Sequence, residues 1–112
     1  MYDHIGLKVK DLDAAVRFYE AALAALGHVR DGAAFGPKGA PALWLSKGTA
    51  GPVHVAFHAA DRKAVERFHA AGLQAGGRDN GTPGLRADYS PKYYAAFLID
   101  PDGNNVEAVC LK

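Results

Sequence analysis

Hydrophobic and polar residues alternate along residues 2–9. Apolar side chains such as Leu7 fall on one face of an extended chain, whereas His4 falls on the other. This alternation predicts a β-strand whose apolar face packs beneath a helix. Over residues 12–26 the apolar side chains recur at helical spacing, and Asp11 is a favourable N-cap for that helix. The segment is therefore predicted to be a strand followed by a helix.

The same pattern returns fifty residues later along the chain. Residues 4–27 align without a gap to residues 54–77, and nine of these 24 positions are identical, including His4 with His54. The second copy predicts a strand over residues 52–58, an N-cap at Asp61 and a helix over residues 62–75. We therefore expect two copies of one strand–helix unit.

Short strands are expected after each helix, because glycine and proline interrupt the apolar runs there. The expected strands cover residues 28–31, 33–36 and 41–46 in the first half and residues 93–100 and 105–111 in the second half. Residues 78–91 are predicted to be irregular and turn-rich, with room for one short strand. The order strand–helix–strand–strand–strand is therefore expected twice.

At 112 residues the chain is expected to form a single domain, because a second independent core would not fit. Its two modules cover about residues 1–47 and 52–112, joined by a glycine- and proline-rich linker. The predicted class is α+β, with helices over one face of mostly antiparallel strands and a trough on the other face. By alternation His4 and His54 lie on the trough face, where two symmetric imidazoles would make half of a metal site.

Composition excludes several classes of protein. The formal net charge is +1 and the basic residues are scattered, so no nucleic-acid partner is expected. No apolar run approaches the roughly 20 residues that span a bilayer, and no signal peptide is evident, so no membrane partner is expected. The single cysteine, Cys110, excludes an internal disulfide. A cytoplasmic location is the simplest expectation.

Three segments together resemble the vicinal oxygen chelate superfamily, which includes glyoxalases, bleomycin-resistance proteins and extradiol dioxygenases. They are Asp3–Leu7 (DHIGL), Asp11–Tyr19 (DLDAAVRFY) and Asp100–Glu107 (DPDGNNVE). The resemblance covers essentially the whole chain. It implies two β-α-β-β-β modules that form an eight-stranded open barrel with helices outside. It also implies a divalent metal in the trough.

The resemblance maps the metal ligands onto His4, His54 and Glu107. Glyoxalase I proteins usually use a fourth ligand near residues 43–45, where this chain has none, so the glutathione-dependent lyase reaction is not implied. Two imidazoles and one carboxylate suit Zn, Ni, Mn, Fe or Co, among which the sequence does not choose. Such an ion would polarise two neighbouring oxygens of a small-molecule substrate. The implied activity is that of a lyase, isomerase, transferase or dioxygenase.

Further residues are candidates for the reaction or for substrate binding. Besides the ligand Glu107, Tyr94 is expected to assist catalysis by hydrogen bonding to a chelated oxyanion. The expected substrate-binding residues are Trp44, His58, Arg86, Tyr89, Lys92 and Tyr93. Aromatic core packing is the competing interpretation of the tyrosines and of Trp44. His28 and His69 are expected to be solvated.

Two other functions remain open on sequence grounds. One is a metal-free protein of the same fold that sequesters an aromatic or cationic compound between Trp44 and the tyrosines. The other is an interaction module without a small-molecule role. The resemblance also implies a homodimer, because many members pair or exchange modules. If the modules are exchanged, His4 and Glu107 of one site could come from different chains.

Overall fold

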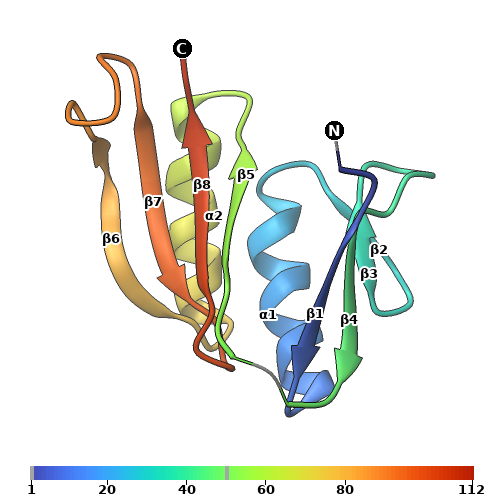
Figure 1. Cartoon of the computed structure of the whole chain (residues 1–112). Coiled ribbons are helices and arrows are strands. Elements are labelled where there is room, and N and C mark those ends of the chain that lie inside the picture. Colours follow the sequence, from blue (N-terminus) through green and yellow to red (C-terminus); the bar gives the residue numbers. More distant parts are fainter. Residues whose placement is uncertain (1, 50) are drawn as a thin grey trace.

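The computed structural model describes residues 2–49 and 51–112, which form eight strands and two helices (Figure 1). The first half contains β1 (Ile5–Val9), α1 (Leu12–Ala24), β2 (Val29–Asp31), β3 (Ala34–Gly36) and β4 (Leu43–Lys47). The second half contains β5 (His54–His58), α2 (Arg62–Gln74), β6 (Arg78–Leu85), β7 (Tyr94–Ile99) and β8 (Asn105–Cys110). The predicted order of strand, helix and three strands is confirmed in both halves.

Both helices begin at the predicted capping residues. The Asp11 carboxylate accepts a hydrogen bond from the Ala14 backbone N–H, and Asp61 accepts the equivalent bond from Ala64. The predicted helices extend one or two residues too far at their C-termini, where the chain turns instead. Gly27 lies in this first turn with a φ of 84°, a backbone conformation that favours glycine. Neither helix of the described residues is long and apolar enough to cross a membrane.

The strands form two four-stranded sheets with the same connectivity. Their orders are β1-β4-β3-β2 and β5-β8-β7-β6. In each sheet the first and last strands of the module pair in parallel, and the other neighbours pair antiparallel. The predicted α+β class and open arrangement are therefore confirmed. β1 and β5 lie at the edges of their sheets, and this position matters for the site described below.

Strand β6 is longer than the one short strand expected in the turn-rich segment after α2. It runs for eight residues, Arg78–Leu85, and pairs with β7 through register shifts on either side of Gly81. As the edge strand of its sheet it tolerates Pro83 and several glycines, because one side of its backbone has no strand to pair with. The glycines and Pro83 therefore belong to an irregular, bulged strand and not to a loop.

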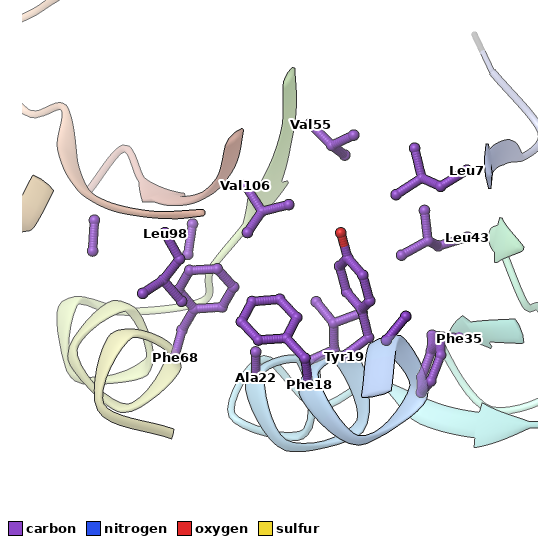
Figure 2. Close-up of a cluster of buried hydrophobic side chains, with 14 of the residues drawn as sticks. Leu7, Phe18, Tyr19, Ala22, Phe35, Leu43, Val55, Phe68, Leu98 and Val106 are labelled. Atoms are coloured by element: carbon purple, nitrogen blue, oxygen red, sulfur yellow. The ribbon is translucent and has the colours of Figure 1, made fainter. Parts of the chain in front are cut away.

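The core lies between the helices and the strands and is shared by the two halves. α1 and α2 run side by side behind the sheets (Figure 1). Figure 2 shows Phe18 and Tyr19 of α1 and Phe68 of α2 directed toward Leu7, Leu43, Val55, Leu98 and Val106 of the strands. Gly72 permits close packing here, since a Cβ at this position would lie 2.3 Å from the Cδ1 atom of Leu98.

A buried hydrogen-bond network also joins the halves. The Tyr19 hydroxyl donates to Asp100 Oδ2 at 2.6 Å, and Asp100 accepts further bonds from the backbone and side-chain nitrogens of Asn104. Asn104 Oδ1 in turn accepts from the backbone N–H of Val53, just before β5. Burial and the Asp100 carboxylate raise the pKa of Tyr19 well above its usual range. The network therefore ties α1 to the β7–β8 turn and to the start of β5.

Candidate functional site

His54 and Glu107 meet on the face of the second sheet that lies opposite the helices. Val55 and Val106 belong to the core, so alternation places their neighbours His54 and Glu107 on the other face. His54 Nε2 donates a hydrogen bond to Glu107 Oε1 at 3.0 Å. Only 3% of the Glu107 side chain is exposed, compared with 48% for His54. The pair therefore combines a buried carboxylate with an accessible imidazole.

Tyr93, just before β7, completes this cluster. Its hydroxyl donates a hydrogen bond to Glu107 Oε2, so both carboxylate oxygens accept bonds from side chains. Burial, the hydrogen bond to Glu107 and the charge of that carboxylate raise the pKa of Tyr93 to about 12. Tyr93 is therefore a neutral donor at physiological pH. The buried carboxylate has the hydrogen bonds that its burial requires.

Aromatic and cationic side chains surround the His54–Glu107 pair. Phe97 pairs with Glu107 in the sheet, and its ring stacks against that of His54 with centroids 6.3 Å apart. The guanidinium of Arg86 lies 5.4 Å from the centre of the Phe97 ring and donates to two backbone carbonyls of β6. Tyr89 contacts Tyr93 edge to face at 4.9 Å. Three predicted substrate-binding residues, Arg86, Tyr89 and Tyr93, thus gather around the pair.

Tyr94 lies on the opposite face of the sheet from this cluster. Its hydroxyl donates to Glu66 of α2 at 2.7 Å, and the guanidinium of Arg62 lies 5.0 Å from the centre of its ring. The hydrogen bond to Glu66 raises the pKa of Tyr94. Neighbouring residues of a strand point to opposite faces, so only one of the two adjacent tyrosines can reach Glu107. The structure corrects the expectation in favour of Tyr93.

Two other predicted substrate-binding residues are not brought to the cluster. His58 is the last residue of β5 and pairs with Val109, four residues beyond His54. That separation corresponds to about 13 Å along a strand. Lys92 is exposed in the turn before β7. Neither side chain contacts Glu107 or His54 in the part of the chain that the structure describes.

His4 lies immediately before β1, with 59% of its side chain exposed. Its Nδ1 atom is 2.8 Å from a carboxylate oxygen of Asp3, and its ring meets that of Trp44 at 6.3 Å. Among residues 2–49 and 51–112, no three His, Cys, Asp or Glu side chains are arranged to share a metal ion. A single chain therefore brings together two of the three predicted ligands, His54 and Glu107.

Two residues of the second module were not anticipated from the sequence. Phe97 was not singled out, because its place beside Glu107 depends on the pairing of β7 with β8. His69 was expected to be solvated, but it is 7% exposed, and its Nε2 atom lies 2.8 Å from Asp79 Oδ1. This hydrogen bond lowers the pKa of the Asp79 carboxyl. His69 joins α2 to β6 and lies outside the site.

The His54–Glu107 pair fits a divalent metal ion as two adjacent ligands. Nitrogen and oxygen ligands lie about 2.1 Å from a first-row divalent ion, so two ligands at the right angles of an octahedral site are about 3.0 Å apart. The two atoms of the pair, His54 Nε2 and Glu107 Oε1, have that separation of 3.0 Å. The Tyr93 hydroxyl would orient the carboxylate as partners of metal ligands commonly do.

Comparison with known proteins identifies relatives across the whole chain. Residues 4–109 match the family model described as a glyoxalase-like domain. A glyoxalase/bleomycin resistance protein from Albidiferax ferrireducens T118 is similar in structure, with 30% identity, a TM-score of 0.83 and 98% of each chain covered. No curated protein matches the sequence.

More distant structures share the fold. A lactoylglutathione lyase from Agrobacterium tumefaciens is 22% identical with a TM-score of 0.70, and the match covers 98% of this chain and 92% of the other. A glyoxalase-related enzyme from Fulvimarina pelagi is 19% identical with a TM-score of 0.68, and the match covers 98% and 87%. These two likenesses establish the architecture alone.

Proposed function

This chain belongs to the glyoxalase-like domain family of the vicinal oxygen chelate superfamily, and we propose that it is a divalent-metal enzyme. Its substrate would be a small molecule with two adjacent oxygen atoms. One observation carries the proposal: a buried carboxylate, Glu107, lies 3.0 Å from the accessible imidazole of His54. A buried carboxylate beside an available nitrogen donor is the start of a site for Zn, Ni, Mn, Fe or Co.

A second copy of the chain would supply the third ligand. His4 is exposed and lies at the start of β1, and both β1 and β5 are edge strands. Edge strands present unpaired backbone groups that a second copy can approach. In a twofold dimer, His4 of the partner subunit would join His54 and Glu107, and the reciprocal contact would create a second site.

Each residue of the site has a distinct role. His54 and Glu107 would hold the ion, which polarises bound oxygens as a Lewis acid when present. Tyr93 donates to Glu107 Oε2, so Oε1, which faces His54 Nε2, is the carboxylate oxygen that would bind the ion. Phe97 packs against the ring of His54, and Tyr89 packs against the ring of Tyr93. Each contact restricts the orientation of the ring that it touches. Stabilisation of charge on adjacent oxygens suits a lyase, an isomerase or a dioxygenase.

A metal-free binding protein is the second candidate, and one observation favours it. Glu107 already accepts hydrogen bonds on both carboxylate oxygens within one chain, so its burial does not require a cation. The trough would then hold an aromatic or cationic compound against Trp44, Tyr89 and Tyr93. Unchanged affinity for such a compound in EDTA would support this function over the metal enzyme.

Metal titration tests the leading proposal. Protein stripped with EDTA and dialysed is titrated with Zn²⁺ or Co²⁺ by calorimetry. We expect His54→Ala, Glu107→Gln and His4→Ala each to weaken binding by at least about tenfold, since each removes a ligand. His58→Ala is the matched control and should leave binding unchanged. Equal metal affinity in all four variants and the wild type would exclude the site.

Mixed dimers test whether the ligands come from two chains. A dimer of one His4→Ala chain and one His54→Ala chain would combine both lost ligands in one site and leave the other site intact. Purified by two affinity tags, it should bind one metal ion per dimer, whereas each parent homodimer binds weakly. No recovery in the mixed dimer would show that the ligands do not come from different chains.

A further inference from the structure

A small cavity lies between the two halves of the chain, and neither His54 nor Glu107 lines it. Its volume is about 180 Å³. Its wall includes Asp3 and His4 just before β1, His28 in the turn after α1, Phe35 of β3, Leu43 of β4 and Phe57 of β5. His4, which the proposed metal site would take from the partner subunit, is also a wall residue, so the cavity is tested below without metal.

The size of the cavity limits its occupant. An engineered apolar cavity of about 150 Å³ stays dry and binds benzene, whereas pockets for drug-sized ligands begin near 300 Å³. The present volume of about 180 Å³ therefore suits one ring with a small substituent. Phe35 and Leu43 are almost fully buried in its wall, with 1% and 3% exposure. These apolar walls favour an occupant that is mostly hydrocarbon.

His28 is the polar group that distinguishes this cavity. The sequence predicted a solvated side chain, but His28 packs edge to face against Phe57 at 5.9 Å, and burial lowers its pKa. Its Nδ1 atom is buried without a hydrogen-bond partner among the described residues. A neutral imidazole carries one N–H, and a proton on Nδ1 would be a buried donor without a partner. The proton is therefore assigned to Nε2, and His28 is a hydrogen-bond donor.

The hydrogen-bond donor His28 and the charged groups of the wall indicate which chemical class of ligand the cavity would bind. A donor on the wall selects an acceptor on the ligand, such as a carbonyl oxygen. The Asp3 carboxylate at the cavity wall is exposed, and no Lys or Arg is among the described wall residues, so no such cation in the wall would pair with an anionic ligand. We propose that this cavity binds a small neutral carbonyl compound, a single ring whose oxygen accepts a hydrogen bond from His28 Nε2.

Two probes of the same shape test the proposal on the wild-type chain. Acetophenone has a carbonyl oxygen where α-methylstyrene has a methylene group, so the pair differs in the acceptor alone. Binding is measured by calorimetry on the full chain in EDTA, which separates the result from the metal site. We expect acetophenone to bind about three- to tenfold more tightly, the effect of one neutral hydrogen bond.

Two variants show whether His28 causes the difference in affinity between the two probes. His28→Phe should abolish the preference for acetophenone, because its carbonyl would then be buried without a donor, and should leave α-methylstyrene within about twofold of wild type. His58→Phe changes a histidine outside the cavity wall and should keep the difference between the probes. In ¹⁵N spectra of the histidine rings, the Nε2–H of His28 should shift when acetophenone is added.

Three results would overturn the proposal. The first is equal affinity of the wild-type chain for the two probes, or no saturable binding of either. The second is a His28 ring that carries its proton on Nδ1. The third is an affinity difference that persists in His28→Phe. None of these results depends on whether a metal ion binds at His54 and Glu107.

Discussion

Trp44 occupies the position in the first sheet that Glu107 occupies in the second. Trp44 pairs with Gly6 of β1, and Glu107 pairs with Ala56 of β5, fifty residues later in the repeat. His4 and His54 are related by the same repeat. The two modules thus present His–Trp and His–Glu pairs at equivalent places, so the first module retains the imidazole without a carboxylate.

Trp44→Glu should strengthen metal binding by at least about tenfold, equivalent to about 1.4 kcal/mol, because it adds a carboxylate next to His4. Trp44 is about half exposed, so its replacement leaves the core intact. Ser46→Glu is the matched control, since it adds the same charge two residues further along β4. Calorimetric titration with Co²⁺ measures both variants. Equal gains in the two variants would indicate general charge attraction instead of a ligand at position 44.

Tyr19→Phe should destabilise the fold by about 1.5–3 kcal/mol, the range for a hydrogen bond to a charged group. The buried Tyr19 hydroxyl donates to Asp100 at 2.6 Å, and its removal leaves that carboxylate short of one donor. Urea unfolding gives the free energy. Tyr94→Phe removes a bond to Glu66 at the surface and should change stability by less than about 0.5 kcal/mol. Similar losses in the two variants would contradict the buried network.

Alkaline pH should weaken the stabilisation that Tyr19 provides. The folded state raises the pKa of Tyr19 above its ordinary value of 10.0, so the unfolded chain releases this proton first as pH rises. The contribution is therefore complete below pH 10 and declines above it by about 1.4 kcal/mol per pH unit. The stability difference between wild type and Tyr19→Phe, measured by urea unfolding from pH 8 to pH 11, should shrink accordingly. A difference that grows with pH would contradict the assigned direction.

Gly72→Ala should destabilise the protein by about 1–3 kcal/mol through overpacking, although alanine is the better helix former by about 1 kcal/mol. The added Cβ would lie 2.3 Å from Leu98 Cδ1 and 3.3 Å from Phe18 Cε1. Gly51→Ala is the control, because a Cβ there meets nothing within 4 Å. Thermal unfolding measures both variants. A stabilised Gly72→Ala protein would show that the packing of α2 against β7 and α1 is looser than described.

Local sequence patterns predicted the helices and most of the strands. Where the structure differs from these predictions, the cause is pairing between strands that are distant in the sequence. The internal repeat and the caps Asp11 and Asp61 give the helices and the module order. The length of strand β6 was underestimated because pairing with β7 overrides its glycines and Pro83. Similarly, alternation alone does not show which of two adjacent tyrosines faces Glu107, since that depends on which side α2 covers.

The candidate site was predictable in part. His54 and Glu107 come together as the family resemblance implies, because β5 pairs in parallel with β8. His4 does not join them within one chain, because β1 and β5 belong to separate sheets. The contact of Phe97 with His54 depends on the three-dimensional packing of side chains from different strands.

The central claim is that His54 and Glu107 hold a divalent ion, and anomalous X-ray diffraction tests it most directly. Crystals of the full chain grown with Co²⁺ are measured on both sides of the cobalt absorption edge. We predict an anomalous peak about 2.1 Å from both His54 Nε2 and Glu107 Oε1, with His4 of the partner subunit as a third neighbour. A map in which the 3.0 Å hydrogen bond between His54 and Glu107 persists without such a peak would contradict the account.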